Sequence, residues 1–266
     1  MTPATRLRRS YLQAVVWLVQ KAKSASVRLT RLTGKSRVAV HPKHLVEVEG
    51  NYNWYLAALQ PGMRLLDVGC GNAMQSLRAV RQQGVTAVGV EGNIANLAAA
   101  VRLASDLPPA AVSFLQADLE AALPVSDASF DAVLLLDVIE HIVRRQPLLR
   151  EIHRVLCPGG LLLVSAPNRQ TRWKRALANA GLFAYADPDH KVEYTLDELY
   201  AELRQGGFEV QGAPLLIVYD TPWTGLIDLT AALSLDLYRY LSTWKARLAQ
   251  RYPGETTGWR LVCRRI

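Results

Sequence analysis

The sequence predicts an α/β fold built on a doubly wound, mostly parallel sheet of seven strands, with an N-terminal helical arm and a helical insertion before the last strand. Short apolar runs alternate with amphipathic segments from residue 63 onward, and such strand–helix units assemble into a parallel sheet through right-handed crossovers. The segment 130–136 is a near-continuous apolar run, as expected of a central strand covered on both faces. A glycine-containing turn follows the first strand, at the edge where open α/β sheets bind ligands.

Seven segments are expected as strands: 64–68, 85–90, 111–116, 130–136, 161–165, 208–218 and 259–264. Helices are expected between them at 73–83, 93–105, 147–156 and 195–205. Thr195 with Glu198 three residues later forms a capping-box pattern at the start of the last of these helices.

Two segments, 167–194 and 220–258, exceed ordinary loop length. The second is rich in Leu and Trp, and we expect one or two amphipathic helices at about 220–257. Its alternatives stay open: a packed helical appendage, a dimer surface or a substrate lid.

Residues 1–44 are expected to form a basic amphipathic arm that precedes the main domain, residues 45–266. Ten Lys and Arg come before the first acidic residue, Glu47, so the remainder of the chain carries −2 of the net +8. Apolar residues recur at helical spacing at Leu12, Val15, Val16 and Val19. Such a helix can lie on an anionic membrane surface. The alternatives are docking on its own domain or a partner, and a partly disordered leader.

The composition favours a reducing, cytoplasmic location. Cys70, Cys157 and Cys263 are far apart and lack the spacing of a disulfide framework or a zinc site. The uncharged run 11–20 is shorter than the roughly 18 apolar residues of a membrane span. Lys21 stands where a signal peptide would need small residues for cleavage. Peripheral contact with the inner face of the membrane, through the arm, is the alternative location.

The turn Asp67-Val68-Gly69-Cys70-Gly71 is the strongest local signal. Glycine allows the backbone to turn sharply and leaves room for a ligand lying against it. A dinucleotide-binding turn would have a third glycine where this chain has Met74, so a pyrophosphate site, and with it a dehydrogenase, is disfavoured. The carboxylate of Asp67 suits a cationic amino group better than a phosphate.

Further short motifs accompany the later strands: Val88-Gly89-Val90-Glu91, Gln116-Ala117-Asp118-Leu119, the segment from Phe130 to Asp137, and Leu156-Cys157-Pro158-Gly159-Gly160. Together with the glycine turn they resemble the class I S-adenosylmethionine (SAM)-dependent methyltransferases, whose fold is Rossmann-like. The chain departs from the family's usual third glycine in having Ala73.

The resemblance implies SAM as cofactor. The turn would hold its methionine part, Glu91 the two ribose hydroxyls and Asp118 the adenine amino group, with Leu119 packing on the ring. The full set of expected cofactor-binding residues is Asp67, Gly69, Cys70, Gly71, Glu91, Gly92, Asp118, Leu119 and Asp137.

The segment from Asp137 to His141 is similar to the subgroup that includes small-molecule and quinone O-methyltransferases. An oxygen nucleophile needs a base with a pKa near neutrality, so we expect His141 and His190 to be catalytic. A substrate contact, a metal ligand and a structural role remain alternatives for His141, and loop capping for His190. A similar acidic cluster in the quinone subgroup binds a divalent metal. Asp137 and His141 supply only two ligands, so no metal site is predicted.

The expected activity is methyl transfer to a small-molecule, lipid-linked or glycan acceptor, at oxygen. An RNA or protein methyltransferase and a non-catalytic SAM-binding partner protein are the alternatives. Nucleic acid is disfavoured as a partner because enzymes that methylate base amino groups carry an Asn/Asp-Pro-Pro-aromatic motif where this chain has Asp137-Val138-Ile139-Glu140. The sequence leaves the oligomeric state open.

Overall fold

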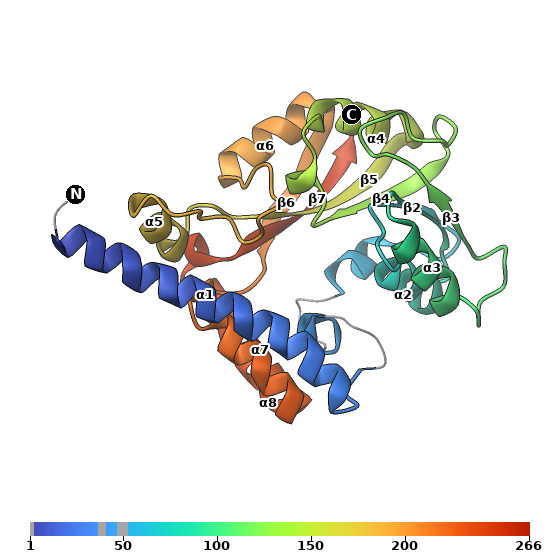
Figure 1. Cartoon of the computed structure of the whole chain (residues 1–266). Helices are drawn as coiled ribbons and strands as arrows, with labels where there is room; N and C mark the ends of the chain where they lie inside the picture. Colours follow the sequence, from blue (N-terminus) through green and yellow to red (C-terminus); the bar gives the residue numbers. More distant parts are fainter. Residues whose placement is uncertain (1–2, 37–40, 47–52) are drawn as a thin grey trace. The chain divides into compact units, whose positions relative to one another are not determined.

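A computed structural model describes residues 3–36, 41–46 and 53–266 (Figure 1). It contains a seven-stranded sheet in the order β3-β2-β1-β4-β5-β7-β6. The strands are β1 (Arg64–Val68), β2 (Thr86–Glu91), β3 (Val112–Gln116), β4 (Phe130–Leu136), β5 (Leu156–Pro167), β6 (Phe208–Leu216) and β7 (Gly258–Arg265). β1 to β5 pair in parallel, and β6 and β7 form a terminal antiparallel hairpin. The predicted Rossmann-like, doubly wound fold is confirmed.

The core lies around the two central strands. In β4 the side chains of Ala132, Val133, Leu134 and Leu135 are all fully buried, and Leu65 and Leu66 of β1 are buried in the same way. Both alternating faces are therefore covered, as the continuous apolar runs predict. The register pairs Leu65 with Ala132 and Asp67 with Leu134, which aligns the carboxyl ends of these strands at one edge.

The helices follow the expected alternation. Those associated with the sheet are α2 (Met74–Gln83), α3 (Ile94–Leu103), α4 (Arg145–Val155) and α6 (Leu196–Gln205). The expected capping box is present in α6, where Thr195 and Glu198 accept from each other's backbone N–H groups. The remaining helices are α1 (Pro3–Leu32), α5 (Arg172–Asn179), α7 (Thr224–Leu233) and α8 (Leu235–Arg251). The segment expected as one or two helices thus forms two.

β5 begins earlier than expected. The sequence predicts a turn through Pro158-Gly159-Gly160, but the strand starts at Leu156, directly after α4. The pairing with β4 shifts register between Phe130 and Ala132, so the extra residues are taken up in an irregularity of the strand. A Cβ on Gly160 would lie 2.9 Å from the carbonyl oxygen of Cys157, which explains why glycine stands there.

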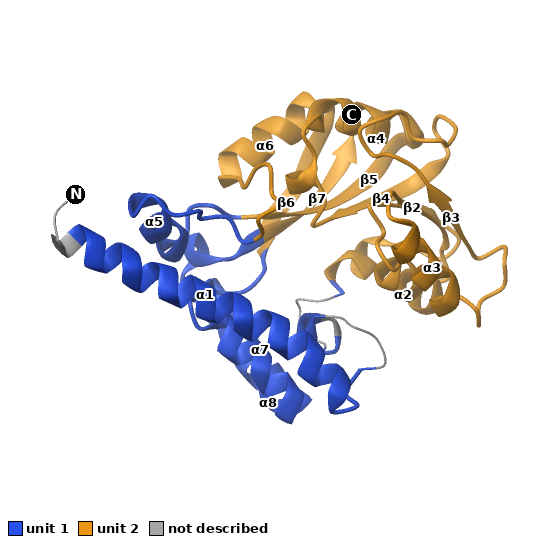
Figure 2. Ribbon diagram, in the orientation of Figure 1, with its two compact units in different colours: residues 1–53, 168–186, 216–258 blue, residues 54–167, 187–215, 259–266 orange. Residues whose placement is uncertain are grey.

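The chain divides into two compact units, coloured separately in Figure 2. Unit 1 consists of Met1–Asn53, Asn168–Ala186 and Leu216–Gly258, and unit 2 of Trp54–Pro167, Asp187–Leu215 and Trp259–Ile266. The arm and the helical insertion, which the sequence presents as separate segments, therefore belong to the same unit. Unit 2 contains nearly the whole sheet. Across the described residues, no helix combines the length and the apolar character of a membrane span.

Within unit 1, α1 packs closely on α7. A Cβ on Gly225 of α7 would lie 2.6 Å from the carbonyl oxygen of Val19 and 2.9 Å from Cβ of Ala22. Glycine at this position lets the two helix backbones approach each other. A small apolar cluster of Val46, Ala231 and Tyr238 adds to the core of this unit.

Candidate functional site

All the residues expected to bind the cofactor lie in unit 2, at or just beyond the ends of β1 to β4. Parallel pairing sets Asp67 of β1 opposite Gly89 of β2, and Glu91 of β2 opposite Gln116 of β3. The carboxyl ends of neighbouring parallel strands meet at one edge, and for this reason residues far apart in the sequence come together there.

The glycine turn after β1 has the backbone that its sequence requires. Gly69 and Gly71 have φ values of +75° and +55°, in the left-handed region that favours glycine. A Cβ on Gly69 would lie 2.6 Å from Cγ2 of Val138 and 3.5 Å from Cδ1 of Leu119, so both side chains lie close to this turn. A Cβ on Gly71 would meet nothing within 4 Å. The space beside Gly71 is open, as a turn that cradles a ligand requires.

Ala73, at the end of this turn, has a left-handed backbone conformation. Its φ is +60°, and its side chain is fully buried. A left-handed conformation costs a non-glycine residue about 1–2 kcal/mol. The turn therefore holds Ala73 at the expense of local strain.

Asp67 is buried beneath the turn, with only 4% of its surface exposed. The pKa of its carboxyl is raised to about 6, chiefly by burial and to a lesser extent by the nearby Glu91, while the hydrogen bond from the hydroxyl of Ser76 acts in the opposite direction. A carboxylate held in this way is stabilised by a cationic group brought beside it. The pKa of the Cys70 thiol is also raised, by the burial of this thiol and by the nearby carboxylates of Asp67 and Glu91, so it stays protonated at neutral pH.

Glu91 bridges the first two strand ends. Its Oε2 accepts from the backbone N–H of Gly71 at 2.9 Å, and its Oε1 accepts from that of Asn93 at 2.8 Å, across the intervening Gly92. Each carboxylate oxygen can accept more than one hydrogen bond, so these contacts leave capacity for hydroxyl donors. Asp118 is exposed and accepts from the backbone N–H of Glu120 at 2.9 Å.

Asp137 follows β4 in a left-handed conformation, with φ of +56°. The hydroxyl of Ser165 in β5 donates to its carboxylate at 2.7 Å, and its own backbone N–H donates to the same hydroxyl oxygen at 2.9 Å. Asp137 is the only non-glycine residue at a strand tip that the described part of the chain holds at positive φ in this way. Such strain concentrates at functional sites.

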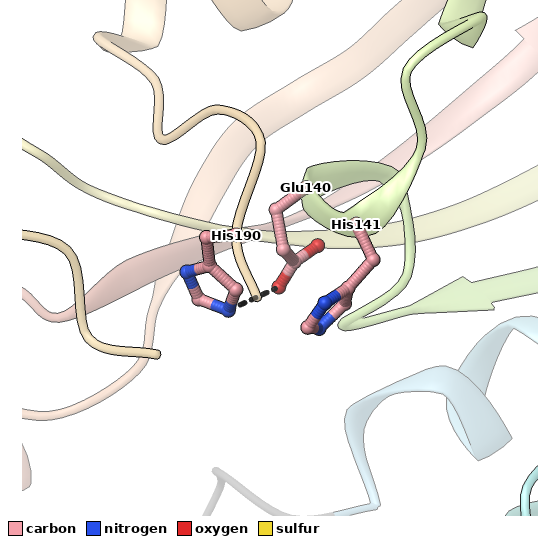
Figure 3. A group of neighbouring side chains, drawn as sticks. All are labelled: Glu140, His141 and His190. Carbon is pink, nitrogen blue, oxygen red and sulfur yellow. Dashed lines mark ion pairs between the residues drawn. The ribbon is translucent and has the colours of Figure 1, made fainter. Parts of the chain in front are cut away.

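The two expected catalytic histidines lie side by side (Figure 3). The ring centroids of His141 and His190 are 4.7 Å apart, and the two rings are in an edge-to-face arrangement. His141 stands on a short 3-10 helix after β4 (Ile139–His141), and His190 on the loop before α6. Partial burial lowers the pKa of His141, and the neighbouring His190 lowers it further. His141 is therefore neutral at pH 7 and able to accept a proton.

Two buried carboxylates stand beside His190. Nδ1 of His190 is 2.8 Å from Oε1 of Glu193, and its Nε2 is 4.0 Å from Oε1 of Glu140. The backbone carbonyl of Glu140 accepts from the N–H of Lys191 at 2.7 Å, which ties the loop to the 3-10 helix. Glu193 is a site residue that was not predicted from the sequence. The one sequence signal for it is its position three residues after His190.

Glu140, His141 and His190 offer three ligand atoms within 4.8 Å of one another. Asp137 and His141 are the two ligands that the sequence suggests, whereas the structure groups His141 with Glu140 and His190. Two imidazoles and a carboxylate form a donor set able to hold a transition-metal ion.

A family model described as a methyltransferase domain matches residues 66–164. A ubiquinone biosynthesis O-methyltransferase of Ruegeria pomeroyi is 31% identical over 170 residues, which cover 61% of this chain and 67% of that protein. A 27-O-demethylrifamycin SV methyltransferase of Amycolatopsis mediterranei is 34% identical over 181 residues, covering 62% of this chain and 61% of the relative. The chain thus spans about two thirds of the length of the first relative and somewhat less of the second.

Among solved structures, the crystal structure of the cyclase SpnF has a TM-score of 0.62 at 22% identity, covering 93% of this chain and 95% of that one. This likeness concerns the fold alone. The segment matched by the family model contains every expected cofactor-binding residue together with His141, whereas His190 and Glu193 lie beyond its end.

Proposed function

The chain belongs to the class I SAM-dependent methyltransferases, and we propose that it methylates an oxygen atom of a small-molecule acceptor, with His141 as the base. The observation that carries this proposal is the pair of adjoining imidazoles, His141 and His190, just beyond β4 and backed by buried carboxylates. When bound, SAM supplies a methyl group that its sulfonium has already activated.

The strand-tip residues fit this cofactor. We assign the cofactor's amino group to the vicinity of Asp67, where a cation relieves the buried carboxylate, and its ribose hydroxyls to Glu91. The open space beside Gly71 accommodates a ligand against the backbone. Asp118 and Leu119 would hold the adenine. Asp137, Gly92 and Cys70 would line the rest of the cofactor-binding site.

An acceptor hydroxyl becomes a good nucleophile as its proton is removed, and a positioned base near neutral pKa contributes about 10²–10⁴-fold to such a step. His141 is partly exposed and is neutral at pH 7, so it takes the proton in this proposal. His190 lies against it and contacts the acceptor from the other side.

Glu193 acts as a positioning residue. Its 2.8 Å contact to Nδ1 of His190 favours the tautomer with the proton on Nδ1, leaving Nε2 on the side of Glu140. Because Glu193 is fully buried, this contact holds the imidazole plane in a fixed orientation. The arrangement is that of a histidine oriented by a carboxylate behind it.

We extend the proposal to the acceptor's chemistry: a hydroxylated compound with an apolar or lipid-linked portion. Support comes from the relatives, whose names concern ubiquinone biosynthesis and 27-O-demethylrifamycin SV. A glycan acceptor has no comparable support.

The test is a screen of hydroxylated acceptors with methyl-labelled SAM, followed by pH profiles of the wild type and two variants, His141→Gln and His190→Gln. We expect His141→Gln to lower kcat/KM by about 10²–10³-fold. In the wild type, kcat/KM should rise with pH through an apparent pKa below 6.5, because His141 must be neutral to act, and this limb should vanish in His141→Gln.

The matched control is His153→Gln, because His153 lies on α4 and contacts the carbonyl oxygen of Ile266 and the ring of Phe208 instead. It should leave kcat/KM unchanged. All variants should bind S-adenosylhomocysteine within about threefold of the wild type. Methyl transfer by His141→Gln at the wild-type rate would show that His141 is not the base. Binding of the cofactor without label transfer to any hydroxyl acceptor would contradict the proposed oxygen acceptor.

A further inference from the structure

The two units carry opposite net charge. Unit 1 contains 18 Lys and Arg against six Asp and Glu, a net charge of +12, whereas unit 2 has a net charge of −4. Residues 1–46 contribute ten of the cations and no acidic residue. The basic character of the chain is thus concentrated in the unit that lacks the expected cofactor-binding residues.

One side of α1 is covered by its own unit. Leu12, Ala22, Ser26 and Thr30 are buried, and the contact of Gly225 with Val19 and Ala22 shows that α7 covers this side. The hydroxyls on the buried side donate to carbonyl oxygens of α1 itself, from Ser26 to Lys23 at 2.7 Å and from Thr30 to Ser26 at 2.5 Å, so they need no other partner. The packing on α7 decides which residues of α1 face solvent.

A stripe of α1 next to the buried side presents large apolar side chains to solvent: Leu7, Tyr11, Leu18, Leu29 and Leu32. Their spacing places them along one narrow ridge at 3.6 residues per turn. Leu7 is 75% exposed and Leu32 80% exposed, values unusual for leucine in a folded domain. We call these five residues the α1 ridge.

Cations and an aromatic residue flank the α1 ridge. Arg6, Lys21 and Arg28 are exposed along one border of it, and Nζ of Lys21 lies 5.8 Å from the centre of the Trp17 ring. Trp17 itself is 60% exposed. An apolar stripe bordered by Trp, Lys and Arg is typical of helices that lie in a membrane interface.

α8 repeats the pattern in the same unit. Leu237, Tyr240 and Trp244 are exposed at i, i+3 and i+7, and the exposed Arg247 and Arg251 continue the same side of the helix. Aromatic rings with a polar edge and arginine side chains with an apolar stem both suit a boundary between water and hydrocarbon.

We propose that unit 1 docks on an anionic phospholipid bilayer, with the α1 ridge at the headgroup–acyl boundary and its flanking cations on lipid phosphates. A second copy of the chain would set a surface of net charge +12 against itself. A nucleic acid would satisfy the cations but leave the leucines of the ridge without an apolar partner. An anionic membrane surface satisfies both.

The test is co-sedimentation of the full chain with vesicles of phosphatidylcholine alone or with 30 mol% phosphatidylglycerol at low salt. Two double variants separate the contributions: Leu18→Ser with Leu29→Ser for the ridge, and Lys21→Glu with Arg28→Glu for the cations. We expect at least tenfold weaker binding to the mixed vesicles for each, and weak binding of the wild type to phosphatidylcholine alone.

The matched controls are Val101→Ser and Arg150→Glu, exposed positions on α3 and α4 of unit 2, which should bind as the wild type does. Unchanged protection of α1 and α7 amides from hydrogen exchange shows that unit 1 of a variant remains folded, independently of the acceptor and of methyl transfer. Equal binding by ridge variants and controls would overturn the proposal. So would vesicle-independent self-association lost in the ridge variants, or tighter binding to an RNA oligonucleotide than to mixed vesicles.

Discussion

At the scale of single residues, Asp67 connects folding to cofactor binding. Its buried carboxyl has a pKa near 6 instead of 3.8, so the folded protein holds a proton there between about pH 4 and 6 that the unfolded chain releases. Stability therefore falls as pH rises through this window, and by linkage the cost above it is about 3 kcal/mol. A ligand ammonium beside the carboxylate removes this cost.

We expect the affinity for S-adenosylhomocysteine to rise with pH up to about 6, by at most tenfold per pH unit, and then to level off, because the bound ammonium requires Asp67 to be ionised. Asp67→Asn should bind more weakly at pH 7 and lose this dependence, without lowering the stability of the unliganded protein. Calorimetry from pH 5 to 8 measures the affinity of the wild type and of Asp67→Asn. The control is Asp106→Asn, which removes an exposed carboxylate paired with Arg81. An unchanged pH dependence in Asp67→Asn would assign the titration to another group.

The glycine turn gives a second residue-scale prediction. Gly69→Ala should lower the free energy of unfolding by about 2–4 kcal/mol, because the new Cβ both meets Val138 and takes a left-handed backbone. Ala73→Gly should instead raise it by up to about 1 kcal/mol, since it relieves strain at φ of +60°.

The control for this pair is Gly84→Ala, where φ is +66° but the nearest atom to a new Cβ is 4.0 Å away. It isolates the backbone cost of about 1–2 kcal/mol from the steric clash. Urea unfolding measures all three variants. A loss for Gly69→Ala no larger than that for Gly84→Ala would mean that Val138 moves aside.

At the scale of elements, the packing of α1 on α7 depends on one glycine. Gly225→Ala would force Cβ to within 2.6 Å of the Val19 carbonyl oxygen, so we expect α1 to separate from α7. Amide hydrogen exchange should then accelerate in α1 and α7, while the affinity for S-adenosylhomocysteine stays within about threefold because unit 2 is not involved. Gly254→Ala, which meets nothing within 4 Å, is the control. Retained protection in α1 would show that other contacts hold it.

Local periodicity is what made the individual elements predictable. β4 is apolar on both faces and α6 carries a capping box, and each lies where its own residues indicate. The early start of β5 was not predictable, because it depends on a register irregularity opposite Phe130 that no local pattern encodes. The docking of α1 on α7 was also hidden. An amphipathic pattern predicts that a helix buries one side, but it does not predict which element packs against that side.

The site divides in the same way. The strand-tip carboxylates could be listed from the order of motifs, because parallel topology brings such positions to one edge. The contact of His141 with His190 and the hydrogen bond of His190 with Glu193 depend on how the loop before α6 folds back to the 3-10 helix after β4. That path is set by hydrogen bonds from the backbone N–H groups of Lys191 and Val192 to the carbonyl oxygen of Glu140. No sequence motif predicts these bonds.

At the scale of the whole molecule, the chain leaves unit 2 twice, after β5 and within β6, to build unit 1 from three separate segments. Deleting the arm would therefore expose the side of α7 that α1 covers, and the loss of vesicle binding by such a deletion would mix unfolding with the loss of a docking surface. Point variants of the α1 ridge avoid this confusion because their side chains already face solvent.

The same division predicts how ligand binding distributes stability. Every expected cofactor residue belongs to unit 2, so S-adenosylhomocysteine at about 100 times its Kd should stabilise that unit by about 2.7 kcal/mol. Hydrogen exchange should slow in β1, β2 and β4 and remain unchanged in α1, α7 and α8, because only a unit that binds the ligand gains this free energy. NAD at the same concentration should slow neither set, since the turn lacks the third glycine of a pyrophosphate site. Equal slowing of exchange in both units would show that they unfold together, and protection by NAD would contradict the assignment of the turn.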